Sequence, residues 1–416
     1  MSAPKVKYFQ DPLYGQIAVG SPLLLALIDS RAVQRLRHIR QLGVSYLTFI
    51  GAEHSRFSHS LGVMNLMGRA LDHLEREEGV RFSRAGRELA SAAGLLHDVG
   101  HCAFSHTLEG VLIGNHERMG ARLLREDPGL KAVLKAKAPQ VAALIEGGAL
   151  GREGRIIHDL LSSQLDMDRL DYMVRDAHYT GVNSGQVDLD RIIASLTVSR
   201  GHLAVKERGL LAVEEYFLAR YFMYWKVYFH KTSRGMDLLL KVLMARAKEL
   251  WNQGALPRES ASPALAAVLD QGGAVGTGLF LDHDDSDILV AVKRWAQGPD
   301  SDLSRLASRF LERRKLTLLW EASSIDEDLS PAVQGRLREH FARRGAEGKA
   351  SLLIEDRLGV APYDRSQPIW VAGAAGLKEL STRSRVVRGI SEPQPHARYY
   401  VPAEDFTAAL ALLKAR

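Results

Sequence analysis

Three histidines and an aspartate stand within ten residues, from His97 to His106, directly after an apolar helical pattern. Leu89, Ala93 and His97 recur at intervals of four, so His97 faces the same side of the predicted helix as its apolar stripe. One buried histidine in such a place is usually a hydrogen-bonded core residue. Three of them beside a carboxylate indicate a polar site built into a helical core.

Another histidine and a later carboxylate extend this polar site. His59 shares a helical face with Val63 and Leu66, and Asp168 lies in an acidic run much further along the chain. Two imidazoles and two carboxylates form a mixed nitrogen and oxygen donor set, which suits a borderline-to-hard divalent ion. We expect one divalent metal ion per active site, and the donor set fits Mn, Fe, Mg, Ni and Zn alike.

The composition places the chain among ordinary globular proteins. It has 416 residues, of which 46% are hydrophobic and 25% charged, which excludes a disordered or collagen-like chain. The single cysteine, Cys102, cannot form an intrachain disulfide, and no apolar run is long enough to cross a bilayer. We therefore expect a cytoplasmic protein without membrane partners. The net charge of +6 suits phosphate-bearing partners but does not distinguish nucleotides from nucleic acids.

Helical periodicity dominates the first 250 residues, and a smaller mixed region follows. We expect a mainly α fold, with a helical core over residues 1–250 and a C-terminal helical and α+β region over 251–416. The predicted elements are helices beginning at Pro22 and covering 162–177, 211–250, 284–296 and 301–320, a loop or insertion over 251–278, and strands over 351–355, 368–372 and 397–402.

The ordered motifs resemble those of one family. His59, the pair His97-Asp98 and Asp168 match the H…HD…D signature of the HD-domain phosphohydrolases. The flanking runs 56–63, 97–106 and 166–176 resemble the deoxynucleoside triphosphate triphosphohydrolase branch, and 11–15 with 41–43 resemble its animal-type subgroup. The resemblance covers about residues 5–250. It implies a helical HD fold, and we expect no SAM domain before it.

The resemblance also implies a role for each matching residue. It assigns the metal to His59, His97, Asp98 and Asp168, and catalysis to His106, Glu109, His101 and His116. Where relatives have aspartate, position 109 is glutamate, and where the animal enzyme has lysine, position 169 is arginine. The substrate-binding residues would be Gln41, Arg56, Arg169, Tyr172, Asp176, Arg220, Tyr228 and Lys231. The implied reaction converts a deoxynucleoside triphosphate to deoxynucleoside and inorganic triphosphate.

The animal-type relatives are regulated oligomers, which implies further partners. The resemblance suggests a homo-oligomer, dimer or tetramer, with an activating nucleotide at Lys7, Asp29, Gln34 and Arg37. Ordinary surface polar residues explain the same pattern equally well. Two other functions stay open: another HD activity, such as a nucleotide monophosphatase or (p)ppGpp hydrolase, and a non-enzymatic HD scaffold that binds single-stranded nucleic acid. The scaffold is less favoured because all four metal ligands are present.

Overall fold

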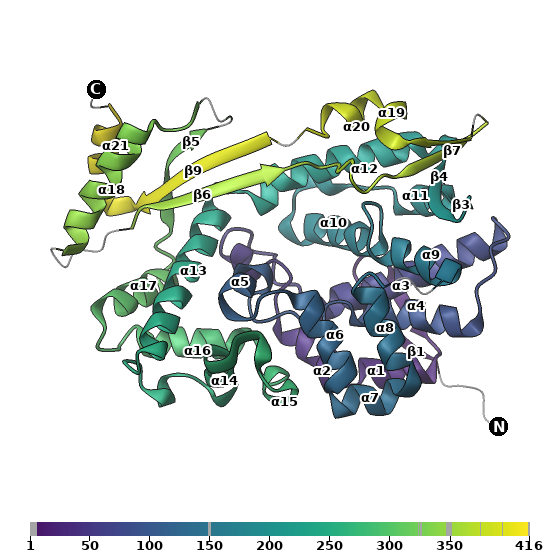
Figure 1. Ribbon diagram of the computed structural model, residues 1–416, viewed down its shortest axis with the longest axis horizontal. Helices are drawn as coiled ribbons and strands as arrows, with labels where there is room; N and C mark the ends of the chain where they lie inside the picture. The colour runs from purple at the N-terminus through teal and green to yellow at the C-terminus, as the bar shows by residue number, and fades with distance from the viewer. Residues whose placement is uncertain are drawn as a thin grey trace.

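The computed structural model describes residues 6–148, 151–322, 324, 327–346, 352–374, 376–392 and 394–414. Most of these residues are helical, and the strands form three small sheets, which confirms the mainly α fold (Figure 1). A search of the described residues found no helix with the length and apolarity that a membrane crossing requires.

The chain begins with a β-hairpin and two short capped helices. Strands β1 (Lys7–Asp11) and β2 (Gly15–Val19) pair antiparallel, and α1 (Pro22–Ile28) and α2 (Arg31–Arg35) follow. The Ser21 hydroxyl accepts a hydrogen bond from the Leu24 N–H, with proline in the first turn, which confirms the predicted helix start. The hairpin itself was not predicted.

Helices α3, α4 and α10 form the framework of the core. Helix α3 (Arg56–Arg76) packs against α4 (Arg84–Leu96) and against α10 (Met167–Thr180). Their apolar stripes are buried, as the periodicity predicted, although α10 begins five residues later than expected. The other helices of this half are α5 (Glu109–Leu112), α6 (His116–Glu126), α7 (Pro128–Leu134), α8 (Ala138–Ile145), α9 (Gly151–Leu161) and α11 (Leu189–Ser195).

A π-helical turn interrupts the long helix predicted over 211–250. Helix α12 (Leu210–Met223) runs into the π turn Tyr224–Tyr228, and α13 (Lys231–Asn252) continues after it. Such turns re-aim the side chains that follow and occur often at functional sites. Here the turn presents Tyr224 and Tyr228 to a cavity described below.

Two predictions for the region after residue 250 were wrong. The segment predicted as a loop contains α14 (Pro263–Gln271), whose Leu265 and Val268 are fully buried in the main core. The helix predicted over 301–320 ends early, because α17 (Ser301–Leu311) is followed by strand β5 (Leu316–Ala322). The remaining helices are α15 (Thr277–Phe280), α16 (Asp285–Trp295), α18 (Pro331–Ala346), α19 (Leu380–Arg383), α20 (Arg385–Gly389) and α21 (Phe406–Lys414).

Two further sheets contain the C-terminal strands. Strands β6 (Ile354–Val360) and β5 flank β9 (Gln394–Pro402), beside α18 and α21 (Figure 1). The other sheet joins the two halves of the chain, because β4 (His202–Lys206) pairs parallel with β7 (Trp370–Gly373), with β3 (Leu196–Ser199) and β8 (Gly376–Glu379) outside them. The predicted strands correspond to β6, β7 and β9; Ser351, the first residue of one, lies outside the described residues. The division at residue 250 stays a prediction.

Candidate active site

The four predicted metal ligands converge at the centre of the helical core. His59 comes from α3, His97 and Asp98 end α4, and Asp168 stands in the first turn of α10. His59 Nε2 lies 3.0 Å from Asp168 Oδ1, 3.3 Å from His97 Nε2 and 3.7 Å from Asp98 Oδ2. His97 Nε2 lies 3.3 Å from Asp98 Oδ1 and 3.6 Å from Asp168 Oδ1. His59, His97 and Asp98 therefore offer three ligand atoms close enough to hold one metal ion, and Asp168 lies beside both imidazoles.

The ionised carboxylates of this cluster favour the binding of a cation. Burial lowers the pKa of His59, but hydrogen bonds to Asp168 and Asp171 outweigh it and raise the pKa to about 10. Burial raises the pKa of Asp98, yet Arg56 and the imidazoles hold it well below its usual range. The carboxylates thus stay ionised and draw a proton onto an imidazole. Because a cation can take the place of that proton, the donor set and its charge fit a divalent metal ion.

The second ring nitrogen of each histidine is held by the protein. His59 Nδ1 lies 2.7 Å from Asp171 Oδ2, and His97 Nδ1 lies 2.9 Å from the Gly94 carbonyl oxygen. Both partners accept hydrogen bonds, so both imidazoles carry the proton on Nδ1. This leaves the two Nε2 lone pairs facing the carboxylates of the cluster, as metal-binding histidines require.

Three imidazoles and one carboxylate form a second cluster beside the first. His106 Nδ1 lies 2.8 Å from Glu109 Oε2, and His116 Nδ1 lies 2.7 Å from Glu109 Oε1. The His116 ring stacks on His101 at 3.8 Å between centroids. Burial raises the pKa of Glu109, but its hydrogen bonds to the two histidines lower it much further, so the carboxylate is ionised between them.

The backbone before His106 is strained. Phe104 and Ser105 both have φ of 55°, a left-handed conformation that non-glycine residues rarely adopt. The Ser105 hydroxyl accepts a hydrogen bond of 2.7 Å from Arg56 Nε, and Arg56 Nη1 lies 2.5 Å from Asp98 Oδ2. Arg56 therefore links the strained loop to Asp98, one of the four predicted metal ligands.

Two adjoining cavities run through the site. One of about 190 Å³ is lined by His97, Asp98 and Asp168 of the first cluster and by the three imidazoles of the second. The other, of about 380 Å³, extends toward the π turn and α13. Gln41, Arg56, His106 and Tyr172 line both cavities, so the narrower cavity at the first cluster adjoins the roomier compartment at these four side chains.

The roomier compartment contains a buried hydrogen-bonded chain. Asp176 Oδ2 accepts a 2.9 Å hydrogen bond from the Tyr228 hydroxyl, and Asp176 Oδ1 lies 2.8 Å from His54 Nε2. Gln41 Oε1 is buried without a hydrogen-bond partner among the described residues. The proximity of His54 to Asp176, 122 positions away, has no local signal in the sequence.

Three predicted phosphate-binding residues do not line either cavity. Arg169 turns away and donates to Ser163 O and to the Asp166 carboxylate. Arg220 is buried, and its Nε and Nη1 have no hydrogen-bond partner among the described residues. Lys231 is exposed at the start of α13.

The four predicted regulatory residues lie together on the surface formed by β1, α1 and α2. Lys7 Nζ lies 3.2 Å from Asp29 Oδ2, and Arg37 Nε donates to Gln34 Oε1 at 2.8 Å. Gln34 Nε2 donates to the Ile28 carbonyl oxygen, directly before Asp29. The four side chains therefore form one polar patch that is remote in sequence from the metal ligands.

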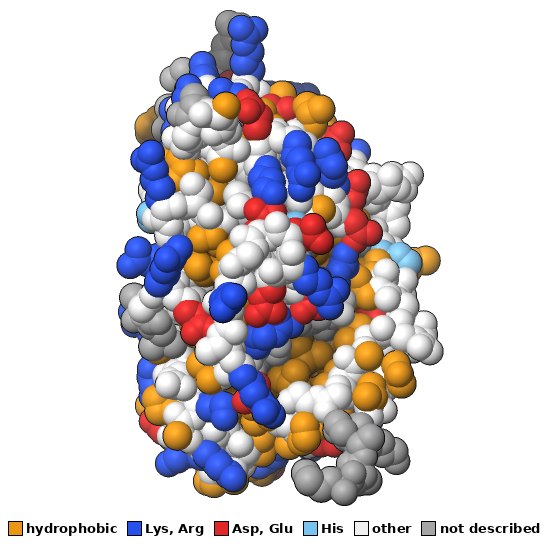
Figure 2. All heavy atoms as spheres, turned by 90° about the vertical axis from the view of Figure 1, so that its right-hand side faces the viewer, with side chains coloured by type: hydrophobic (Ala, Val, Ile, Leu, Met, Phe, Trp, Pro, Cys, Tyr) orange, Lys and Arg blue, Asp and Glu red, His pale blue; other side chains and the backbone are white. Residues whose placement is uncertain are grey.

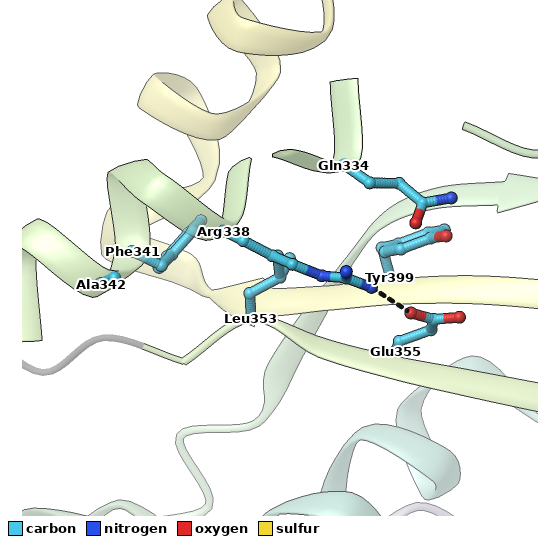
Figure 3. Close-up of a pocket in the computed structure, with 7 residues that line it drawn as sticks. All are labelled: Gln334, Arg338, Phe341, Ala342, Leu353, Glu355 and Tyr399. Atoms are coloured by element: carbon cyan, nitrogen blue, oxygen red, sulfur yellow. Dashed lines mark hydrogen bonds and ion pairs between the residues drawn. The ribbon is translucent and has the colours of Figure 1, made fainter. Parts of the chain in front are cut away.

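A separate cavity of about 340 Å³ lies in the C-terminal region between α18 and the strands β6 and β9 (Figure 3). Arg338 and Glu355 form an ion pair of 3.3 Å across it, and Phe341 and Tyr399 line it. It contains no histidine and none of the predicted site residues. The chemistry-bearing groups are therefore concentrated in the helical core.

Comparisons with known proteins agree with this geometry. The HD domain family matches residues 56–173, and the HD associated region matches residues 187–260. The uncharacterized protein YwfO of Bacillus subtilis is 34% identical over 409 residues, which cover 95% of this chain and 92% of that protein. A crystal structure of a phosphohydrolase from Bacteroides thetaiotaomicron superposes with a TM-score of 0.84 at 30% identity, covering 95% of this chain and 99% of that one.

A relative with a stated activity matches a shorter segment. The deoxynucleoside triphosphate triphosphohydrolase SAMHD1 of Danio rerio is 30% identical over 287 residues. The match covers 59% of this chain and 46% of that protein, so it spans less than half the length of the relative.

Proposed function

We propose that this chain, which belongs to the HD-domain phosphohydrolase family, hydrolyses deoxynucleoside triphosphates to deoxynucleoside and inorganic triphosphate. The observation that carries this proposal is that the cavity at the predicted metal ligands adjoins the compartment at Asp176 and Tyr228, with four lining residues in common. The narrower cavity offers a cation site and imidazoles, which suit phosphates, and the roomier compartment offers polar groups and aromatic rings, which suit a nucleoside. The named activity of the SAMHD1 relative supports the same substrate class.

The metal ligands would be His59, His97, Asp98 and Asp168. A divalent ion held there would supply Lewis-acid polarisation of a phosphate oxygen and a more acidic water. Asp98 is shared with Arg56, which adds a fixed positive charge on the same side of the cavity. Arg56 therefore lies where it can form charge-assisted hydrogen bonds with the α-phosphate.

Proton transfer would be carried out by His106. Its Nδ1 is occupied by Glu109, which leaves Nε2 for a substrate that occupies the cavity lined by His106. In the proposed reaction water attacks the α-phosphorus, the bond to the 5′-oxygen breaks, and His106 donates a proton to that oxygen. His116, held by the same Glu109, and the neighbouring His101 would contact phosphate oxygens.

The remaining phosphates would be bound by basic residues just outside the cavities. Arg220 is the best placed of these, because two of its buried nitrogens lack partners and can donate hydrogen bonds to an anion. Arg169 would have to leave Asp166, and Lys231 is exposed, so both assignments require side-chain movement when the triphosphate binds.

The deoxyribose would occupy the compartment lined by Gln41, Tyr172, Asp176 and Tyr228. Gln41 Oε1 lacks a partner among the described residues and can accept a hydrogen bond from the 3′-hydroxyl. The Tyr228 ring, fixed by its hydrogen bond to Asp176, would pack against C2′ and leave no room for a ribose hydroxyl. A hydrophobic contact of this kind discriminates only about 100-fold, so slow cleavage of ribonucleotides is compatible with the proposal.

The test is a product analysis with purified protein. The substrates would be dGTP, dATP, GTP, dGMP, ppGpp and a single-stranded oligonucleotide, each with Mn²⁺, Mg²⁺, Fe²⁺, Ni²⁺ and Zn²⁺, separated by ion-exchange chromatography. We expect equal amounts of deoxynucleoside and inorganic triphosphate from dGTP and dATP. Release of orthophosphate or pyrophosphate instead would overturn the cleavage position, and cleavage of only dGMP or ppGpp would favour the other HD activities.

The nucleic-acid scaffold is the weaker alternative. On the face shown in Figure 2, Lys and Arg side chains are interspersed with Asp and Glu and do not form one continuous basic surface. A scaffold would bind the oligonucleotide without metal and with a steep salt dependence, and would release no product.

We propose further that a nucleotide binds the patch formed by Lys7, Asp29, Gln34 and Arg37, at an interface of a homo-oligomer. These four side chains lie together at the surface, which supports the proposal. The ion pair of Lys7 with Asp29 and the hydrogen bond of Arg37 to Gln34 could both be replaced by contacts with a nucleotide. We expect GTP to activate the enzyme and the specific activity, the rate per amount of protein, to rise with protein concentration. Kinetics insensitive to both would remove this proposal. The single cysteine, Cys102, cannot form an intrachain disulfide, which supports our proposal of a cytoplasmic location.

A further inference from the structure

The proposed metal ligand His59 rests on a buried carboxylate that the sequence motifs did not assign to the site. Asp171 Oδ2 lies 2.7 Å from His59 Nδ1, and both side chains are shielded from solvent. Asp171 stands three residues after Asp168 on α10, so one helix supplies both a ligand and the support of another ligand. A carboxylate behind a metal-binding imidazole fixes its tautomer and its orientation.

Besides His59, Asp171 has two further hydrogen-bond partners. Arg175 donates to both of its oxygens, with Nε 2.8 Å from Oδ2 and Nη2 3.0 Å from Oδ1. The Tyr14 hydroxyl donates to Oδ1 at 2.7 Å. Asp171 and Arg175 stand four residues apart on α10, so helix geometry alone brings this pair together. The third partner, Tyr14, comes from the turn of the N-terminal hairpin, 157 positions away.

The hairpin turn is fastened to the same network a second time. Arg175 Nη1 donates to Asp11 Oδ2 at 2.9 Å, and Asp11 Oδ1 accepts hydrogen bonds from the backbone N–H groups of Leu13 and Tyr14. The turn that carries Tyr14 is therefore rigid where it meets Asp171. Burial and the neighbouring carboxylate raise the pKa of Tyr14 far above its usual value, so its hydroxyl remains a donor.

The opposite side of the network leaves no spare room. Gly62 of α3 lies against it, and a Cβ at this position would overlap the Asp171 carboxylate and the Arg175 guanidinium. The carboxylate is thus confined between α3 on one side and the hairpin turn on the other. Small shifts of either neighbour would be transmitted to the His59 ring.

We infer that Tyr14 is a positioning residue for the metal centre, which acts through Asp171 on His59. The hairpin β1–β2 then serves as the outer support of the site, and the affinity for the metal depends on a single hydroxyl group of that hairpin. The inference rests on the proposed metal site but does not depend on which phosphate ester is hydrolysed.

The test compares metal binding by the wild type, Tyr14→Phe and Tyr8→Phe. Tyr8 lies on the same hairpin but is 63% exposed, so its variant is the matched control. The full-length protein would be stripped of metal, and the dissociation constant for Mn²⁺ would be measured by competition with a chromophoric chelator. The unfolding temperature of the stripped protein would be measured in parallel.

We expect Tyr14→Phe to bind Mn²⁺ about tenfold or more weakly, since outer partners of metal ligands contribute about 10–100-fold to affinity. Tyr8→Phe should match the wild type. Equal Mn²⁺ affinity of Tyr14→Phe and the wild type, with or without a lower unfolding temperature, would overturn the inference. If the wild type itself bound no divalent metal, the proposed metal site would fall, and the two failures are thereby distinguishable.

Discussion

The backbone N–H of Phe104 donates a 2.7 Å hydrogen bond to the side chain of Asp285, 181 positions further along the chain. Asp285 opens α16, and its second oxygen accepts a hydrogen bond of 3.1 Å from the Arg40 N–H. One buried carboxylate therefore holds both Phe104, the first of the two left-handed residues before His106, and Arg40, the residue before Gln41. Segments that line the proposed active site are thus fixed by the part of the chain beyond residue 250.

The first prediction concerns the stability contribution of Asp285. Burial raises its pKa to about 6, above the unfolded value of about 3.9. The folded state therefore binds the proton more tightly, and this contribution is greatest below pH 4 and is lost as pH rises through 6. Relative to Asp285→Asn, the wild type should lose about 2 kcal/mol of unfolding free energy between pH 4 and pH 7, measured by urea denaturation. Parallel curves for the two proteins would contradict this prediction, and the exposed Asp302→Asn serves as the control.

The second prediction concerns the metal ligands. Asp168→Asn removes one charged donor and leaves no arginine unpaired, whereas Asp98→Ala also strands the buried Arg56. Both variants should lose bound metal and hydrolytic activity, and Asp168→Asn should lower the unfolding temperature of the metal-free protein less than Asp98→Ala does. Elemental analysis of the purified proteins checks the metal content. A full complement of metal in Asp168→Asn would refute its assignment as a ligand.

The third prediction concerns Glu109, which bridges two imidazoles. Glu109→Gln can present an acceptor oxygen to His106 or to His116, but not to both, so one ring loses its orientation. The kcat should fall about 100-fold or more, because a positioned general acid contributes about 10²–10⁴-fold. KM and metal content should change little. A variant whose kcat is unchanged would remove Glu109 from the proton-transfer machinery.

The fourth prediction concerns His54. His54→Ala leaves Asp176 Oδ1 without its partner in a buried place and loosens the support of Tyr228. The loss of a hydrogen bond to a charged group costs about 1.5–3 kcal/mol, which corresponds to about 10–100-fold in kcat/KM for a deoxynucleotide. Steady-state kinetics with dGTP and GTP measure this, with the exposed His38→Ala as control. An unchanged kcat/KM for dGTP in His54→Ala would show that His54 only fills space.

The fifth prediction concerns the ring of Tyr228. Tyr228→Phe keeps the surface that we propose to contact C2′, so the preference for deoxynucleotides should persist. Tyr228→Ala should narrow the ratio of kcat/KM for dGTP to that for GTP by about tenfold, within the limit of about 100-fold for such a contact. If the alanine variant discriminated as the wild type does, another residue would have to exclude ribose.

Helical periodicity predicted the framework of the molecule well, because the apolar stripes of α3, α4 and α10 are buried as the pattern required. The motifs predicted His59 and His97, whose Nε2 atoms the structure places 3.0–3.7 Å from Asp98 and Asp168, although the role of these residues as metal ligands stays a prediction. Local sequence was sufficient in both cases, because helix geometry fixes which side chains share a face.

The remaining site geometry depends on contacts between distant segments. Tyr14 and Asp285 reach the site from 157 and 181 positions away, and no periodicity marks them. Asp166 and a bound phosphate would compete for the guanidinium of Arg169, and the spacing of residues along α10 does not decide which of them it contacts. Beyond Leu311, an amphipathic pattern was extended into what is strand β5, because its apolar residues fit a sheet equally well.

The parallel pairing of β4 with β7 has a consequence for the order of events during synthesis. Ala204 meets Trp370, and Gln164, in the loop before α10, bonds to the backbone of Asp364 and Gln367. At about 5–20 residues per second, the ribosome needs roughly 10–30 s to make the intervening chain of about 170 residues. Throughout that interval the nascent protein exposes the unpaired edge of β4, which packs against α9. Newly made copies would therefore depend on chaperones that cover this edge until the segment around Trp370 emerges.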